Sequence, residues 1–278
     1  MILYKILGGE IMRYKLFFEL ENKEISIQYR KSILSFFKKS LSEYDMAKYE
    51  KLYHAKDPII KPYTFAVFFR DSEFKENEFK KYYNQKDNII KPYAFSVFFR
   101  HPQINGQEII LEDKRLEMNM TIENYETAII IYNAFNHQRN KVFHLEHNSM
   151  TLKNIVLVPE KQINTDEVTI KFMSPLIVRQ RENEKDYYYS IEGEKFLETL
   201  KINIKEQLKL TNYPTEIIDT IKLEKINGRK TVIKFYEKQM EGTIGTFKLY
   251  GNKDLLSYLY KSGIGSRRSS GFGMFEVV

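Results

Sequence analysis

The chain has 278 residues, 42% of them hydrophobic, a length and composition that suit two domains of ordinary size. Zero cysteines and five scattered histidines exclude disulfides, cysteine nucleophiles and thiolate metal sites, so any chemistry must use His, Lys, Tyr, Ser or carboxylates. The net charge of +7, from 44 Lys and Arg against 37 Asp and Glu, favours a polyanionic partner without requiring one.

The N-terminal residues carry no targeting signal that we recognise. No run of about 18 apolar residues is present, and the signal-peptide layout is missing, so we expect a soluble, cytoplasmic protein without a membrane span. A second methionine, Met12, stands just before the first regular pattern. Gly8, Gly9 and Glu10 correspond to purine-rich codons like those of a ribosome-binding site. We therefore interpret residues 1–11 as an N-terminal extension.

The first domain is expected over residues 12–160. Alternation predicts a strand at 14–20, and the spacing of Ile33, Leu34, Phe37 and Leu41 predicts one face of a helix. Strands are further predicted at 63–69, 93–99, 115–122 and 150–158, and a helix at 123–136. Residues 159–166 are polar and form the natural boundary.

An internal duplication lies inside this first domain. KDPIIKPYTFAVFFR, residues 56–70, recurs 30 positions later as KDNIIKPYAFSVFFR, residues 86–100. Two divergent copies do not make a solenoid, which needs three or more units to bury a continuous core. We interpret the segment as one duplicated strand-and-loop unit inserted in a compact domain.

The second domain is expected over residues 165–278. A strand at 168–178, bent by Pro175, precedes a helix at 193–210 whose buried stripe is Phe196, Leu197, Leu200 and Ile204. Strands at 221–226, 231–236 and 245–250, a helix at 254–262 and a strand at 272–277 complete the order. Both halves then predict an α+β protein built from tandem ferredoxin-like, RRM-like βαββαβ domains.

The strongest motif is GIGSRRSSGFG, residues 263–273, between the last predicted helix and strand. Its glycines permit positive φ and close approach of backbone N–H groups to a phosphate, while the arginines and serines add donors. It is neither a Walker A loop nor a dinucleotide-binding fingerprint. A sugar-phosphate backbone is the predicted ligand, and a solvated hairpin that happens to be basic is the alternative. The residues predicted to bind are Gly263, Gly265, Ser266, Arg267, Arg268, Ser269, Ser270, Gly271 and Gly273.

This loop, followed by a strand, resembles the C-terminal glycine-rich loop of the CRISPR-associated endoribonucleases that process precursor CRISPR RNA, in the RAMP superfamily. The likeness continues in IKFMSPLIV, FLETLKINIKEQ and GTFKLYGNKDLLSYLYKSGIG, and it extends to RYKLFFEL and KPYAFSVFF near the N-terminus. It spans nearly all of residues 12–278 and is most specific at the C-terminus. The resemblance implies CRISPR repeat RNA as partner, and a CRISPR effector complex as a further one.

The resemblance also implies a metal-independent cleavage without a cofactor, in which the ribose 2′-OH attacks the adjacent phosphate and leaves 2′,3′-cyclic phosphate and 5′-OH ends. By placement after the first helix, it assigns the general base to His54 and stabilisation of the phosphate to Lys61, with Tyr53 as an assisting group. Which copy of the duplicated unit takes the family's position stays open, because Lys91 and YAFSVFF are equally suitable. Tyr29, Tyr44 and Tyr49 are alternative assisting tyrosines, and His137 is an alternative base.

Two other functions fit the same sequence. One is a non-catalytic RNA-binding subunit of a CRISPR effector complex, with the same domains and loop but no turnover. The other is a general binder of single-stranded RNA. In either case basic residues outside the loop are candidates for tracking the RNA stem, with ordinary surface charge as the alternative: Arg179, Arg181, Arg229 and Lys230.

Overall fold

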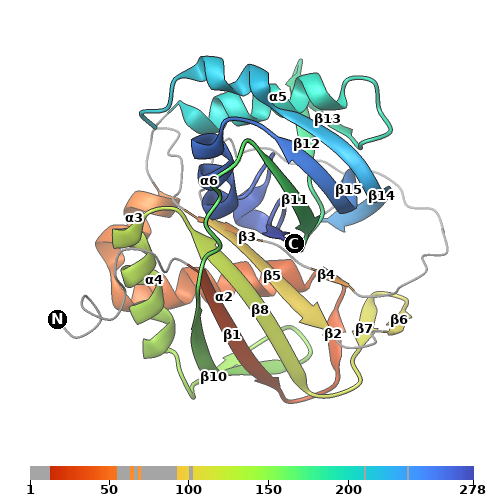
Figure 1. The fold of residues 1–278 in the computed structure, drawn as a ribbon. Coiled ribbons are helices and arrows are strands. Elements are labelled where there is room, and N and C mark those ends of the chain that lie inside the picture. Colours follow the sequence, from red (N-terminus) through yellow and green to blue (C-terminus); the bar gives the residue numbers. More distant parts are fainter. Residues whose placement is uncertain are drawn as a thin grey trace.

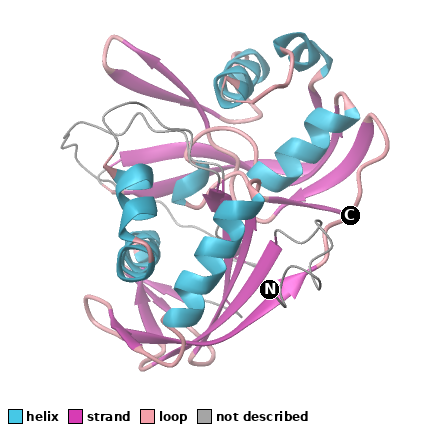
Figure 2. Ribbon diagram, turned by 90° about the vertical axis from the view of Figure 1, so that its left-hand side faces the viewer, coloured by secondary structure: helices cyan, strands magenta, loops and turns pink. Residues whose placement is uncertain are grey.

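The computed structural model describes residues 13–54, 63–65, 68–69, 93–99, 103–209, 211–236 and 238–278. Figure 1 shows two helix-and-sheet units, with the N-terminal unit below and the C-terminal unit, coloured cyan to blue, above. A view turned by 90° shows helices lying against the sheets of both units (Figure 2). None of the described helices is long and apolar enough to cross a membrane.

The N-terminal unit holds a mixed sheet in the order β4-β5-β8-β1-β10-β9 and a small sheet in the order β2-β7-β6. Strands β5, β8, β1 and β10, with α2 and α4 as crossovers, have the order of a ferredoxin-like domain. The bounds are β1 (Arg13–Leu20), β2 (Glu24–Ser26), α2 (Tyr29–Tyr44), α3 (Met46–Tyr53), β3 (Tyr63–Phe65), β4 (Phe68–Phe69), β5 (Tyr93–Phe99), β6 (Gln103–Asn105), β7 (Glu108–Ile110), β8 (Arg115–Ile122), α4 (Tyr125–His137), β9 (Val142–His144) and β10 (Ser149–Val158).

The C-terminal unit repeats this plan around a sheet in the order β14-β15-β11-β16, with a separate hairpin of β12 and β13. The tandem ferredoxin-like fold predicted from the sequence is therefore present. The bounds are β11 (Glu167–Phe172), β12 (Val178–Glu182), β13 (Lys185–Tyr189), α5 (Phe196–Leu208), the 3₁₀ helix η1 (Thr215–Thr220), β14 (Lys222–Phe235), β15 (Lys238–Tyr250), α6 (Lys253–Ser262), the 3₁₀ helix η2 (Arg268–Ser270) and β16 (Phe275–Val277).

One face of the N-terminal sheet packs against α2 and α4. Alternate residues of β1, among them Leu16, Phe18 and Leu20, are at most 2% exposed, as the period of a half-buried strand requires. The Phe18 ring lies edge-on to Phe36 of α2, with centroids 5.3 Å apart, and Phe36 stacks on Phe135 of α4 at 5.5 Å. The predicted helix face on α2 is confirmed by these contacts.

The C-terminal core is built the same way from α5 and α6. Leu200 and Ile204 of α5 and Leu255 of α6 are fully buried. Leu197, which the sequence placed in the buried stripe of α5, is 37% exposed. This expectation was wrong because positions 196, 200 and 204 recur every four residues and already fill the face of the helix that meets the sheet.

Strand β14 is longer than its sequence indicates. Two strands were expected at 221–226 and 231–236, whereas Lys222–Phe235 forms one strand with a bulge between Lys225 and Asn227. Gly228 lies in the gap between the two expected strands, and a Cβ there would lie 2.1 Å from Cζ of Phe247. The glycine therefore marks the close approach of an aromatic ring inside a sheet, not the end of a strand.

The two copies of the duplicated unit pair with the same edge of the sheet. Strand β3, from the first copy, is antiparallel to β8 with Tyr63 opposite Ile122, and β5, from the second copy, pairs with Tyr93 opposite Ile122. The β3 pairing covers three residues and the β5 pairing covers six. Both copies thus pair with β8 in the same register, so the register does not distinguish one copy from the other as the partner of β8.

A buried arginine joins the two units. Arg13 of β1 is 3% exposed, and its Nη1 donates to Glu276 Oε2 at 2.6 Å. Its Nη2 donates to the carbonyl oxygens of Tyr260, at 3.2 Å, and Phe275, at 2.9 Å. The guanidinium also lies 3.7 Å from the centroid of the Tyr260 ring. One side chain from the first strand therefore contacts both α6 and β16 of the other unit.

Candidate nucleic-acid interface

The glycine-rich loop, residues 263–273, connects α6 to β16 and is closed by its own backbone. The N–H of Ile264 donates to the carbonyl of Gly273 at 2.9 Å, and the N–H of Gly273 donates to that of Pro175 at 2.9 Å. Gly265 and Gly273 have φ of +85° and +71°. A Cβ on Gly273 would lie 1.9 Å from the Ile264 oxygen, so the fold demands glycine there.

Most of this loop lies inside the protein. Ile264 and Phe272, the apolar residues between the glycines, are fully buried. Strands β3 and β5 of the N-terminal sheet lie against η2, so the loop sits where the two units meet. Ser266, Arg267 and Ser270 are the predicted binding residues that stay partly exposed, whereas the rest of the predicted set is buried.

Arg268 is turned into the protein. It is 3% exposed, and its Nη1 donates to the carbonyl of Ser262 at 2.8 Å. Burial lowers the pKa of the guanidinium to about 10, although interactions with Tyr258 and Glu123 act in the opposite direction. The structure thus gives Arg268 a role in holding the loop against α6, and its contact with RNA stays a prediction.

Arg267 has a left-handed backbone conformation, with φ of 59° and ψ of 21°, and η2 follows immediately. Among the described residues, none accepts a hydrogen bond from the N–H groups of Arg267, Arg268 or Ser269. Successive N–H groups at a change between left- and right-handed backbone form a concavity that binds anions. Of the residues predicted to bind phosphate, four have N–H groups that are already bonded within the protein: Ser266, Ser270, Gly271 and Gly273.

The Arg267 side chain belongs to a cluster of charged residues around Asp186 of β13. Its Nη2 lies 3.3 Å from Asp186 Oδ2. Arg179 of β12 places Nη1 3.3 Å from Oδ1, and Lys238, the first residue of β15, places Nζ 2.8 Å from Oδ2. The Tyr188 hydroxyl donates to the same carboxylate at 3.4 Å. Three cations from three parts of the C-terminal unit therefore converge on one carboxylate.

Asn203 of α5 fixes the loop and the hairpin relative to each other. Its Oδ1 accepts from the N–H of Arg179 at 3.0 Å and from Ser266 Oγ at 2.6 Å. Its Nδ2 donates to the carbonyl of Arg179 at 2.8 Å. One amide side chain thus supplies both donor and acceptor to β12 and also holds the exposed serine of the loop.

His54, the predicted base, ends α3 and is exposed. Its Nε2 lies 3.2 Å from the Tyr49 hydroxyl, and the two rings are 5.3 Å apart. Tyr53 is half-buried, packs against the N-terminal core and has Lys38 Nζ 5.4 Å from its ring centroid. The structure therefore brings Tyr49 to the histidine. Lys61 lies outside the described residues.

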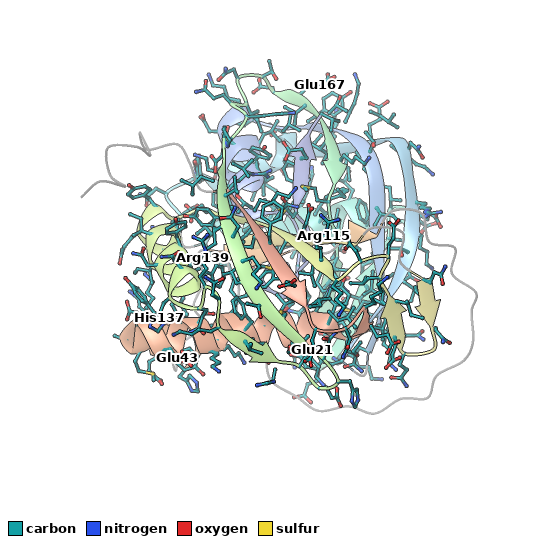
Figure 3. All side chains as sticks on the ribbon, turned by 90° about the horizontal axis from the view of Figure 1, so that it is seen from below. Glu21, Glu43, Arg115, His137, Arg139 and Glu167 are labelled. Carbon is teal, nitrogen blue, oxygen red and sulfur yellow. The ribbon has the colours of Figure 1, made fainter. Side chains whose placement is uncertain are left out.

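His137 is the alternative base. It ends α4, with Lys141 Nζ 3.4 Å from its Nδ1, and Figure 3 labels it beside Glu43 at the end of α2. Within the part of the chain that the structure describes, no three His, Asp or Glu side chains are grouped as metal ligands would be.

Several residues of this interface were not found from the sequence. Asp186, Asn203 and Lys238 carry no motif. Apart from Tyr188, which is two positions from Asp186, the partners named above lie between 7 and 81 positions away. Arg179 was predicted only as one of four basic residues that could track the RNA stem, and the sequence did not rank it above the other three. Only the pairing of β12 with β13 and the return of the chain at residues 263–273 bring these side chains together.

Two ferredoxin-like domains in tandem, with a glycine-rich loop before the final strand, define the architecture of this chain. Residues 158–277 match the family described as CRISPR associated protein Cas6, C-terminal. This match covers the glycine-rich loop and supports the resemblance that the loop carries. No curated protein matches the sequence.

Solved structures share the fold over nearly the whole chain. The product of a Cas6-related gene from Pyrococcus furiosus aligns with a TM-score of 0.74 at 17% identity, covering 96% of this chain and 98% of that chain. A RAMP protein described as binding different RNA substrates gives 0.70 at 15%, covering 96% and 99%. A Cas6 product complex gives 0.64 at 12%, covering 96% and 100%. These likenesses confirm the tandem ferredoxin-like fold.

Proposed function

We propose that this protein binds CRISPR repeat RNA and cleaves precursor CRISPR RNA without a metal ion. The observation that carries the proposal is the glycine-rich loop in a Cas6 C-terminal domain, with Arg267 and three successive N–H groups at its partly exposed turn. Structures of similar fold are described as a product complex, a substrate mimic complex and a binder of different RNA substrates, which supports RNA as the ligand.

The cleavage needs a base for the 2′-OH, an acid for the leaving 5′ oxygen and a cation for the charge on the phosphorane. His54 is exposed and accessible to a 2′-OH, and an imidazole can act as a general base. The Tyr49 hydroxyl lies 3.2 Å from Nε2, which orients the ring and leaves Nδ1 for the substrate. Lys61 is the proposed cation, and Tyr53 serves mainly to pack α3 onto the domain.

Cleavage of repeat RNA from the same genome, with EDTA present, tests this proposal. We expect product with 2′,3′-cyclic phosphate and 5′-OH ends, and a loss of at least about 100-fold in single-turnover rate for His54→Ala. His137→Ala is the matched control and should cleave as the unaltered protein does. Activity that needs a divalent metal, or that survives in His54→Ala, would show that the mechanism is wrong.

A non-catalytic RNA-binding subunit is the second candidate, and one observation favours it. The second copy of the duplicated unit pairs with β8 over six residues and the first copy over three. If the second copy holds the strand position, the residue equivalent to His54 is Asn84, which cannot act as a base. Tight binding of repeat RNA with no product from the unaltered protein would support this function over the enzyme.

A further inference from the structure

The charged cluster around Asp186 has more positive than negative side chains, unlike an ordinary surface ion pair. The Asp186 side chain is 6% exposed, and its one negative charge faces the cations of Arg179, Arg267 and Lys238. The cations are themselves shielded from water, with exposures of 20%, 19% and 31%. These four side chains alone carry an excess of two positive charges in a partly dehydrated place.

The two arginines repel each other across the carboxylate. The pKa of the Arg179 guanidinium is lowered, first by burial and then by the charge of Arg267, although Asp186 acts in the opposite direction. In addition, Arg267 adopts φ of 59°, a left-handed conformation that is strained for a residue other than glycine. The fold therefore holds two guanidinium groups close together at an energetic cost. Such a pair can donate several hydrogen bonds to one anion.

The donors of the cluster are not all used. The Nε of Arg267 is buried and has no hydrogen-bond partner among the described residues. The N–H groups of Arg267, Arg268 and Ser269 lie on the same turn, next to the partly exposed Ser266 and Ser270. A phosphate at this turn would receive backbone and guanidinium donors together.

The geometry assigns Arg179, Lys238 and Arg267 to one phosphate-binding subsite for the RNA backbone, with Asp186 as its positioning residue. The assignment rests on the proposed RNA-binding function and deepens it. Asp186 does not contact the RNA. It holds the three cations at one spacing, and Asn203 holds the hairpin and the loop that carry Arg179 and Arg267.

Loss of the Asp186 carboxylate has two opposite expected effects on the affinity for RNA, one from the net charge and one from the positions of the cations. Replacing Asp186 by asparagine raises the net charge by one, which by itself strengthens binding to any RNA. The same change releases the cations from their common anchor, which weakens binding to an RNA whose phosphates must fit their spacing. The sign of the effect on repeat RNA therefore separates positioning from simple electrostatics.

The test compares Asp186→Asn with Glu182→Gln, which makes the same charge change at an exposed position of the same hairpin. Affinities are measured by fluorescence anisotropy for repeat RNA and for an oligouridine of similar length, over a series of salt concentrations. We expect Asp186→Asn to bind repeat RNA at least about tenfold more weakly, with a salt slope smaller by about one phosphate contact. Oligouridine binding should not weaken, and Glu182→Gln, which leaves the cluster intact, should bind both RNAs at least as tightly as the unaltered protein does.

Equal or tighter binding of repeat RNA by Asp186→Asn than by Glu182→Gln overturns the assignment. Should Asp186→Asn unfold, Arg179→Gln and Lys238→Gln test the subsite directly. Each should weaken repeat RNA binding and reduce the salt slope, and unchanged affinity in both overturns it. If the unaltered protein itself does not prefer repeat RNA to oligouridine, the proposed function fails instead, whatever these variants do.

Discussion

Glycine can be required at a position by a positive φ, by crowding where a Cβ would lie, or by both, and two glycines of this chain separate these effects. Gly273 and Gly106 both have positive φ, but a Cβ on Gly106 has no atom within 4 Å. We expect Gly106→Ala to cost about 1 kcal/mol in the free energy of unfolding, and Gly273→Ala at least about 3 kcal/mol because of the Ile264 oxygen. Urea denaturation measures both. Similar losses at the two positions would mean that conformation alone explains the glycines.

The Asp186 carboxylate should also contribute to stability in a way that depends on pH. Burial raises its pKa, but the hydrogen bond from Lys238 and the charges of Arg179 and Arg267 outweigh this, so the folded-state pKa lies below the ordinary value. The contribution is then present above the unfolded aspartate pKa of about 3.9 and is lost as pH falls through the folded-state value. We expect Asp186→Asn to lower the free energy of unfolding at pH 7 more than at pH 3. Glu182→Gln serves as control, and a loss equal at both pH values would contradict the prediction.

At the scale of the elements, the duplicated unit offers one sheet edge two partners. The edge of β8 at Ile122, Thr121 and Met120 can hydrogen-bond one strand at a time, yet β3 and β5 share these residues as partners. Deleting residues 56–85 or residues 71–100 leaves a single copy at the same distance from His54. We expect both shortened proteins to fold with melting temperatures within a few degrees of each other, since a 30-residue insertion adds little loop entropy. A variant that fails to fold would show that its missing copy is the one the sheet requires.

The elements that the sequence predicted well are those with a long, one-sided pattern. The face of α2 around Ile33 and Phe37 and the inward leucines of α6 follow from helical spacing alone. The short helix α3 was missed because Leu52 is its one buried residue, so it has no apolar stripe for a sequence pattern to reveal. The β12–β13 hairpin was missed because its alternation is among polar and aromatic residues. Since Asp186 lies on that hairpin, the interface could be predicted only as far as its loop.

The same limit applies to the loop itself. In the sequence, Arg267 and Arg268 are adjacent and basic and lie between Gly265 and Gly271. Both are therefore predicted to bind phosphate. The backbone directs Arg267 to Asp186 and Arg268 to the Ser262 carbonyl inside the protein. No pattern in the chain distinguishes the two, because the difference depends on one left-handed residue and on which surfaces α6 leaves open.

At the scale of the whole molecule, the two units share a hydrophobic core. Ile177, Phe235, Met240 and Phe272 of the C-terminal unit belong to the same cluster as the buried residues of α2 and β1. The Arg30 guanidinium of α2 also lies 4.7 Å from the Phe272 ring centroid. The glycine-rich loop is therefore supported from both units, and the orientation of one unit affects the proposed phosphate site on the other.

This shared core predicts that the protein unfolds in one transition, with the calorimetric and van't Hoff enthalpies equal. Arg13 tests the coupling, because Arg13→Ala leaves Glu276 Oε2 and two carbonyl groups without the donor that Arg13 supplies at the interface. We expect a loss of roughly 2–3 kcal/mol, discounted for the partial exposure of Glu276. Lys15→Ala, on the same strand, removes a more exposed ion pair with Glu117 and should cost less than about 1 kcal/mol. Two separate transitions in the unaltered protein, or equal losses in the two variants, would mean that the units fold independently and that the loop depends on its own domain alone.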